Sequence, residues 1–213
     1  MKKNPIISAR YVISSATHKQ CPPANKPEYA FIGRSNVGKS SLINMLTGQT
    51  KLAKISATPG KTQLINHFEI QSANKKFWNL VDLPGYGYAA TVGKKARNNW
   101  GNMIESYIRK RENLVTLFVL VDSRHEPQKI DLEFIDQLGE WQVPFVVVFT
   151  KTDKNKPGGT KNRVEAFKNA LLQSWQFLPQ FFITSSEKGE GREEILKFIE
   201  QLNAEFKLEL PGS

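Results

Sequence analysis

The segment YAFIGRSNVGKSSLINML, residues 29–46, carries the strongest indication of the fold of this chain. Its first four residues form an apolar run typical of a buried strand, and the segment from Gly33 to Ser41 matches the pattern GxxxxGK[ST]. The residues KSSLINML that follow are predicted to form a helix. A glycine-containing turn in this context lets backbone N–H groups surround phosphates, and the helix N-terminus adds partial positive charge. The sequence therefore predicts a phosphate-binding loop.

The rest of the chain alternates short apolar runs with longer amphipathic stretches. The runs are NHFEI, FWNLVDLPG, LVTLFVLVD, PFVVVFT and FFITSS. This alternation predicts an α/β fold, a three-layer P-loop NTPase with a mostly parallel central sheet flanked by helices. Two runs, LVTLFVLVD and PFVVVFT, are apolar at nearly every position, so we expect central strands that are buried on both faces.

Two predicted helices carry apolar residues at spacings of three and four, which places those residues on one face. In the first helix they are Trp100, Met103, Ile104, Tyr107 and Ile108. In the last helix, residues 192–206, they are Ile195, Phe198, Ile199 and Leu202. Both faces are expected to pack against the sheet.

A length of 213 residues fits a single hydrophobic core. We expect one nucleotide-binding domain over residues 29–207, a lead-in segment over 1–28 and a short tail over 208–213. The lead-in contains the proline-rich stretch CPPANKP and, in ARYVISSA, a candidate edge strand. No internal repeat is visible.

Composition narrows the class of protein. No apolar run approaches the roughly 20 residues that cross a bilayer, and the N-terminus lacks the pattern of a secretory signal. Cys21 is the only cysteine, which excludes an intramolecular disulfide. We therefore expect a cytoplasmic protein. The net charge of +10 favours polyanionic partners such as RNA or anionic lipid, and the alternative is a merely basic surface.

Two motifs predict how phosphates and Mg²⁺ are held. Lys39 is expected to neutralise the β- and γ-phosphates, and the Ser40 hydroxyl to ligate Mg²⁺. Asp82 ends the run FWNLV and Gly85 follows three residues later, which is a DxxG arrangement. Asp82 would hold Mg²⁺ through water, and the N–H of Gly85 would bind the γ-phosphate; an aspartate that ends a strand can also be a turn former. The predicted nucleotide-binding residues of the two loops are Gly33, Arg34, Ser35, Asn36, Val37, Gly38, Lys39, Ser40, Ser41, Asp82, Leu83, Pro84 and Gly85.

Between these motifs lies SATPGKTQLINHF, a polar segment long enough to cross the nucleotide as a loop. Thr58 and Thr62 both qualify as a further Mg²⁺ ligand, and we favour Thr62. Gly60 and Lys61 are assigned to the same nucleotide-binding segment. Lys39, Thr62 and Gly85 form the predicted catalytic set.

The segment TKTD, Thr150–Asp153, directly follows an apolar strand and so lies at the carboxyl edge of the sheet. The carboxylate of Asp153 can accept hydrogen bonds from both the N1–H and the 2-amino group of guanine. Adenine lacks this pair of donors. Lys151 would pack its aliphatic stem along the base, and Thr152 completes the segment. The residues Thr184, Ser185 and Ser186 would offer backbone N–H groups to the guanine oxygen, although serines at a strand end are often helix caps.

Taken in order, GRSNVGKS, TPGKTQ, DLPGYGYA, TKTD and TSS resemble the translation-factor-related GTPases, and most closely the bacterial EngB/YihA family of ribosome-assembly GTPases, over about residues 30–200. The resemblance implies a Ras-like domain that alternates between GTP- and GDP-bound states and assists maturation of the large ribosomal subunit, with cell division or septation as an associated process. It also implies that Thr62 is the switch threonine and that Asp82 to Gly85 form the second switch.

Two positions bear on hydrolysis. Tyr86 stands where many small GTPases place the glutamine that orients water, so intrinsic hydrolysis should be slow. Asn36 is similar to the asparagine with which some related GTPases hold K⁺; the alternative is a loop asparagine in a turn conformation.

A basic surface follows the second switch. The residues Lys94, Lys95, Arg97, Arg109, Lys110 and Arg111 bracket the apolar stripe of one helix, and we expect them to contact ribosomal RNA through its phosphates. The alternative is a solvated helix face. We expect a monomer. Two other classes remain as alternatives, a membrane-associated transport GTPase and a small nucleotide-dependent kinase.

Overall fold

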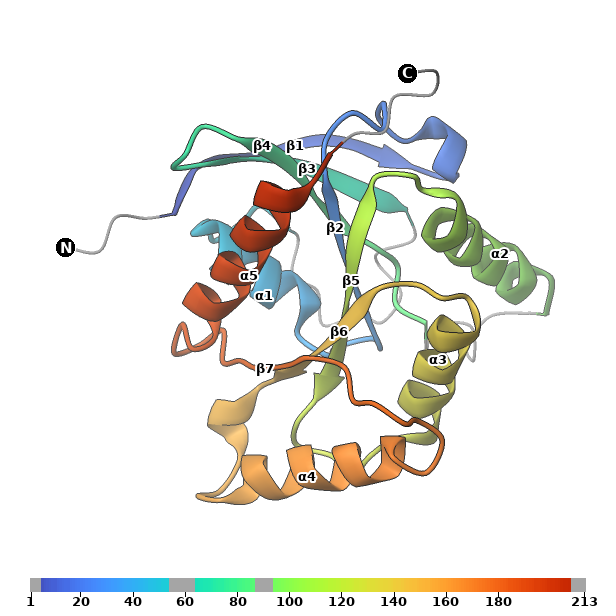
Figure 1. Cartoon of the computed structure of the whole chain (residues 1–213), viewed down its shortest axis with the longest axis vertical. Helices are drawn as coiled ribbons and strands as arrows, with labels where there is room; N and C mark the ends of the chain where they lie inside the picture. Colours follow the sequence, from blue (N-terminus) through green and yellow to red (C-terminus); the bar gives the residue numbers. More distant parts are fainter. Residues whose placement is uncertain (1–4, 54–63, 87–93, 208–213) are drawn as a thin grey trace.

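The computed structural model describes residues 5–53, 64–86 and 94–207, and the side chains of residues 94–100 lie outside this description. A seven-stranded sheet forms the middle of the molecule, in the order β1-β3-β4-β2-β5-β6-β7 (Figure 1). Strand β2 pairs in parallel with β4 and β5, and β6 continues the parallel sheet to β7, whereas β1–β3 and β3–β4 are antiparallel. The prediction of a mostly parallel sheet is confirmed. The strands are β1 (Ile6–Ser15), β2 (Glu28–Gly33), β3 (Ile65–Ser72), β4 (Phe77–Asp82), β5 (Leu114–Asp122), β6 (Phe145–Thr150) and β7 (Phe181–Ile183).

Helices cover both faces of this sheet. Helices α1 (Lys39–Thr47) and α5 (Arg192–Glu205) pack on one face. Helices α2 (Lys94–Lys110), α3 (Lys129–Glu140) and α4 (Gly159–Leu171) pack on the other (Figure 1). In the described part of the chain, two 3₁₀ helices, His18–Gln20 and Thr152–Lys154, lie in the connections. The three-layer α/β architecture predicted from the sequence is therefore the one observed.

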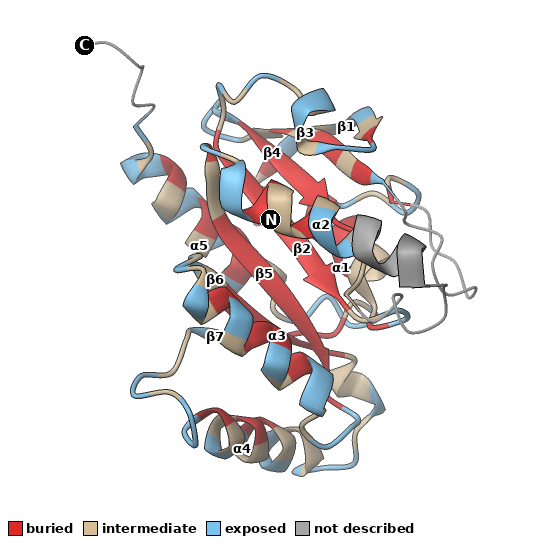
Figure 2. Cartoon of the chain, turned by 90° about the vertical axis from the view of Figure 1, so that its right-hand side faces the viewer, coloured by how far each residue is buried: buried red, intermediate tan, exposed pale blue. Residues whose placement is uncertain are grey.

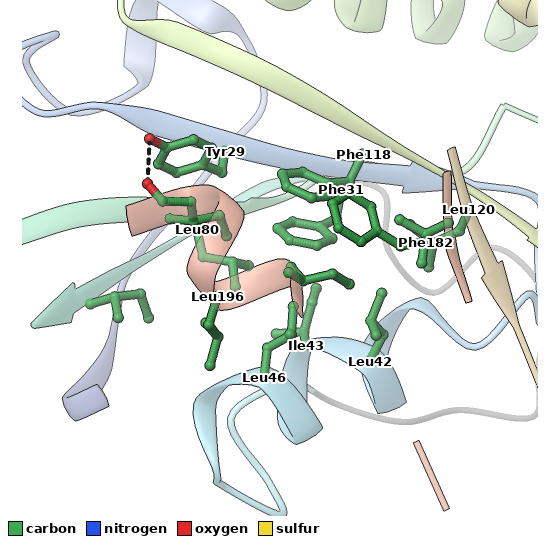
Figure 3. Packing of buried hydrophobic residues seen from close by; sticks show 14 of the residues in the cluster. Tyr29, Phe31, Leu42, Ile43, Leu46, Leu80, Phe118, Leu120, Phe182 and Leu196 are labelled. Carbon is green, nitrogen blue, oxygen red and sulfur yellow. Dashed lines mark hydrogen bonds between the residues drawn. The ribbon is translucent and has the colours of Figure 1, made fainter. Parts of the chain in front are cut away.

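The central strands separate two hydrophobic clusters. Along β2, Tyr29 and Phe31 face α1 and α5, where Phe31 stacks on Phe118 with ring centroids 4.6 Å apart (Figure 3). Ala30 and Ile32 face the opposite cluster. Strands buried on both faces become apolar at nearly every position, and Figure 2 shows β2 and β5 coloured as buried along most of their length.

The helix faces predicted from spacing lie in these clusters, except for Trp100, whose side chain lies outside the described residues. Ile104, Tyr107 and Ile108 of α2 are buried, and Met103 packs against them. In α5, Ile195 and Ile199 are buried, with Phe198 and Leu202 packed alongside. At the N-terminus, residues 6–15 form the edge strand β1, antiparallel to β3.

The structure corrects one prediction about the basic surface. Arg111 points inward: its side chain is 8% exposed, and its guanidinium donates to both carboxylate oxygens of the fully buried Glu28, at 2.6 and 2.8 Å, and to the Pro22 carbonyl. Tyr107 donates its hydroxyl to the same carboxylate at 2.8 Å. The prediction that Arg111 contacts RNA is wrong, because its charge is paired inside the fold.

Candidate nucleotide site

The predicted phosphate loop lies at the point where the sheet reverses its strand order. Strand β2 has β4 on one side and β5 on the other, and ligands of open α/β sheets bind at the carboxyl ends of strands at such a point. The loop leaves β2 at Gly33 and enters α1 at Lys39. Its backbone adopts positive φ at Asn36 (61°) and Gly38 (102°), which gives the sharp curl that directs N–H groups inward.

Helix α1 begins within the motif, so Lys39, Ser40 and Ser41 form its first turn. No acidic residue occupies that turn. The positive end of the helix dipole therefore faces the loop without a neutralising carboxylate on the helix itself, which favours an anion there.

A carboxylate meets the lysine of the loop at the end of β4. The Nζ of Lys39 contacts Oδ1 of Asp82, whose side chain is 4% exposed, and Nδ2 of Asn66 lies 3.5 Å from Oδ2. A buried carboxylate beside a serine at a helix N-terminus is an oxygen donor set of the kind that Mg²⁺ prefers when phosphate supplies the remaining ligands. The residues present therefore fit a Mg²⁺–nucleotide complex.

The DxxG segment packs directly against the phosphate loop. Leu83 is buried and donates its N–H to the Phe31 carbonyl at 3.0 Å, which extends the pairing of β4 with β2. A Cβ on Gly85 would lie 2.3 Å from the carbonyl oxygen of Gly33. Only glycine fits this position, because any side chain would displace one backbone from the other.

Two side chains of the TKTD segment donate hydrogen bonds to the same loop. Thr150 donates its hydroxyl to the Val37 carbonyl at 2.6 Å, and Lys151 donates to the Asn36 carbonyl at 2.5 Å. Lys151 itself has φ of 60°, a left-handed conformation that turns the chain out of β6. The TKTD segment and the phosphate loop are thus connected by two hydrogen bonds.

Sequence reasoning missed Asp122, which ends β5 and holds this lysine in place. Its Oδ2 lies 2.8 Å from Nζ of Lys151, and Arg124 donates to both of its carboxylate oxygens. Burial raises the pKa of Asp122, but the hydrogen bonds from Arg124 and Lys151 outweigh burial and hold the pKa well below its usual range. The signal was available, because Asp122 ends a central strand just as Asp82 does.

Asp153, the predicted guanine reader, is oriented by a serine of the TSS segment. Ser185 donates its hydroxyl to Oδ1 of Asp153 at 2.7 Å, and Lys154 lies 3.0 Å from Oδ2. The hydrogen bond from Ser185 lowers the pKa of Asp153 despite some burial. The carboxylate is therefore ionised at neutral pH and able to accept from two donors.

The structure changes the predicted role of the TSS segment. The N–H of Thr184 donates to the Phe149 carbonyl at 2.7 Å, and the N–H of Ser185 donates to Glu190 at 3.2 Å. These two groups are used within the protein, so the prediction that they donate to guanine is wrong. Ser186 instead lines the adjacent groove, and Thr152 donates its hydroxyl to the Thr184 carbonyl.

The groove beside these segments has a volume of about 550 Å³, which suits a nucleoside. Its lining comes from α1, the loop after α1, the TKTD segment and the TSS segment, and it includes Gly38, Ser41, Thr150, Lys151, Asp153 and Ser186. The groove thus brings Gly38 and Ser41 together with the TKTD and TSS segments, whereas Asp82 and Gly85 contact the phosphate loop outside its lining. Thr58, Gly60, Lys61 and Thr62 lie outside the described residues.

A second missed residue lies on α3. Asp131 is fully buried, and its carboxylate receives hydrogen bonds from Arg34 of the phosphate loop and from Tyr86, which directly follows the DxxG segment. It occupies the apolar stripe of the helix, three, four and seven residues before Phe134, Ile135 and Leu138. A carboxylate on a buried helix face must be paired, and that pattern could have identified it.

A phosphate loop, a buried carboxylate beside it and an aspartate in a TKTD segment after a central strand are the features of a GTPase of the P-loop class. The family model described as "50S ribosome-binding GTPase" matches residues 28–151. Curated relatives include a "Probable GTP-binding protein EngB" of Porphyromonas gingivalis, which is 57% identical over 94% of this chain and 98% of the relative. The protein of the same name from Bacteroides fragilis is 56% identical, also over 94% of this chain and 98% of the relative. The chain belongs to this family of GTPases, and within it to the EngB GTP-binding proteins.

Solved structures agree with the fold. A crystal structure of a probable GTP-binding protein EngB is 26% identical, with a TM-score of 0.58 over 84% of this chain and 99% of that one. Era in complex with MgGDPNP and nucleotides 1506–1542 of 16S ribosomal RNA is 25% identical, with a TM-score of 0.69 over 87% of this chain and 59% of that one. This chain thus spans about three fifths of that Era chain. Among the described helices, none has the length and apolar character needed to cross a bilayer.

Proposed function

We propose that this GTPase is a molecular switch that hydrolyses GTP slowly and assists assembly of the large ribosomal subunit. The observation that carries the nucleotide part is that three elements meet at the phosphate loop: Asp82 contacts Lys39, Gly85 packs against Gly33, and the TKTD segment with Asp153 lines the groove beside Gly38. The ribosomal part is supported by the description of the matching family, by the net charge of +10, and by the resemblance of the motifs to ribosome-assembly GTPases.

Within this proposal each described residue has one task. Lys39 neutralises the β- and γ-phosphates, Ser40 and Asp82 hold Mg²⁺, and the N–H of Gly85 contacts the γ-phosphate. Bound Mg²⁺ would neutralise charge on the phosphate oxygens. Thr62 is proposed as the further metal ligand.

Slow intrinsic hydrolysis is supported by the surroundings of Tyr86. Its hydroxyl donates to Asp131 at 2.7 Å and its ring stacks on Phe134 at 4.3 Å, so the side chain is occupied by α3. A side chain held in this way does not orient an attacking water. We also propose K⁺ as a cofactor near Asn36, since a monovalent cation can supply positive charge; equal hydrolysis rates in Na⁺ and K⁺ would contradict this.

The proposed RNA-binding surface is the basic end of α2 without Arg111. Lys110 is exposed, whereas Arg109 pairs with Glu105 at 2.7 Å and lies over the Trp141 ring. Lys94, Lys95 and Arg97 begin the same helix and complete the proposed surface, and their side chains lie outside the described residues. Contacts of this kind act through phosphates and weaken as salt rises.

The experiment is a sucrose gradient of cell extract with the purified protein and either GDP or a nonhydrolysable GTP analogue, at moderate salt. We expect migration with the large subunit only in the presence of the analogue. Replacing Lys94, Lys95 and Arg97 together by alanine should weaken this migration, while the control Lys197→Ala on α5 should not. Absence of migration with either nucleotide would contradict the ribosomal role, and binding to liposomes instead would favour a transport GTPase.

A further inference from the structure

One buried carboxylate connects the phosphate loop with the DxxG segment. Asp131 of α3 is 0% exposed, and its Oδ1 accepts from Nε of Arg34 at 2.9 Å and from the hydroxyl of Tyr86 at 2.7 Å. Its Oδ2 also accepts from Arg34 Nε, at 3.2 Å. Burial of the hydroxyl and the charge of Asp131 hold the pKa of Tyr86 well above its usual range, so the hydroxyl stays protonated and donates.

The two donors directly follow the two glycines of the site in sequence. Arg34 follows Gly33 and Tyr86 follows Gly85, and these glycines are so close that a Cβ on Gly85 would lie 2.3 Å from the Gly33 carbonyl oxygen. The backbone contact and the shared carboxylate of Asp131 therefore hold the same two segments together. The Tyr86 ring is fixed further by its stacking on Phe134, with an angle of 18° between the planes.

We propose that Asp131 is a positioning residue that keeps Gly85 against the phosphate loop, so that the Tyr86–Asp131 hydrogen bond selectively favours the GTP-bound state. The inference rests on the proposed function, in which Gly85 contacts the γ-phosphate. GDP has no γ-phosphate and makes no such contact, so its affinity is independent of where Gly85 lies. The affinity for GTP falls in proportion to the fraction of molecules in which Gly85 is correctly placed.

The test is Tyr86→Phe, which removes the hydroxyl and keeps the ring that stacks on Phe134. Affinities for a fluorescent nonhydrolysable GTP analogue and for fluorescent GDP are measured by titration. We expect the analogue to bind about threefold to tenfold more weakly, in line with the loss of one hydrogen bond, and GDP to bind as it does to the unmodified chain. Asp131→Ala, which also removes the partner of Arg34, should shift the same ratio. Adding Tyr86→Phe to Asp131→Ala should change the ratio little further, because the Tyr86–Asp131 hydrogen bond is already absent.

The chain offers a matched control in Tyr107→Phe. Tyr107 is also a tyrosine that donates to a buried carboxylate, Oε2 of Glu28 at 2.8 Å. Glu28 begins β2 and Gly33 ends it, so this pair lies roughly 16 Å from the loop. Tyr107→Phe should lower the midpoint of thermal unfolding and leave the ratio of analogue to GDP affinity unchanged.

The outcomes separate this inference from the function on which it rests. If the unmodified chain binds both nucleotides and Tyr86→Phe leaves their affinity ratio unchanged, the positioning role is refuted and the GTPase switch stands. A shift of equal size in Tyr107→Phe would also refute it, because the effect would then follow stability alone. If the unmodified chain binds neither nucleotide, the proposed function and this inference both fall.

Discussion

Replacing Arg111 by alanine tests whether this residue holds the fold together or binds RNA. The substitution removes both hydrogen bonds that the guanidinium gives to Glu28 and leaves the Pro22 carbonyl without that donor. Breaking a buried ion pair by removing one partner costs about 3–5 kcal/mol. Because Tyr107 and Asn79 still donate to Glu28, at 2.8 and 3.2 Å, we expect the lower end, a loss of about 3 kcal/mol in the free energy of unfolding.

Urea unfolding, monitored by circular dichroism, measures this loss of stability. A change of that size lowers the urea midpoint by about 1 M when the free energy of unfolding falls by about 2–3 kcal/mol per M of urea. The control is Lys110→Ala, whose exposed side chain is the preceding residue on α2; its effect should stay within about 0.5 kcal/mol. If Arg111→Ala unfolded like the unmodified chain and instead weakened salt-dependent ribosome binding, the assignment of Arg111 to the core would be refuted and its role in RNA contact restored.

Three further predictions concern the site and the buried pair. Gly85→Ala places a methyl group 2.3 Å from the Gly33 carbonyl oxygen, so binding of a GTP analogue, measured by fluorescence titration, should fall by about tenfold or more. Asp153→Asn should weaken GDP binding by about tenfold to hundredfold, since one guanine donor loses its acceptor, whereas Lys154→Ala should have little effect in the same titration. The hydrogen bonds to Glu28 outweigh its burial and hold its pKa well below the usual range. As the pH falls, Glu28 is therefore protonated in the unfolded chain before it is protonated in the folded chain. Stability should therefore fall as the pH drops below about 4.3, and urea midpoints of Glu28→Gln should show a shallower fall.

The phosphate loop and the strands could be predicted because their signals are local. A strand, a glycine-containing turn and a helix follow one another within residues 29–46, and their hydrophobic pattern changes period at the turn. The DxxG and TKTD segments were found by the same logic, each at the end of an apolar run. Glycine at position 85 was assigned from its motif, and the structure adds the reason, a close approach to Gly33.

Other features depend on side-chain direction, which spacing alone does not settle. Arg111 lies in the run IRKRE, and a charge run at a helix end gives no sign that one guanidinium turns toward a buried glutamate 83 residues earlier in the chain. Thr184 and Ser185 follow a strand as predicted, but their N–H groups complete pairing with Phe149 and Glu190. Backbone donors at a strand end are available to a ligand only when the fold leaves them without partners.

The two segments beside the phosphate loop are held to it by different contacts. Thr150 and Lys151 both donate to carbonyls of the loop, so the TKTD segment cannot move away from the loop without breaking both hydrogen bonds. The DxxG segment beyond Leu83 is held to the same loop by the close packing of Gly85 and by the hydroxyl that Tyr86 directs at Asp131. Under the proposed function, the segment that contacts the γ-phosphate can therefore shift by exchanging the Tyr86 hydrogen bond and the Gly85 packing, while both hydrogen bonds from Thr150 and Lys151 to the loop are kept. A GTPase switch that stays bound to its nucleotide as it changes state needs this difference between the two segments.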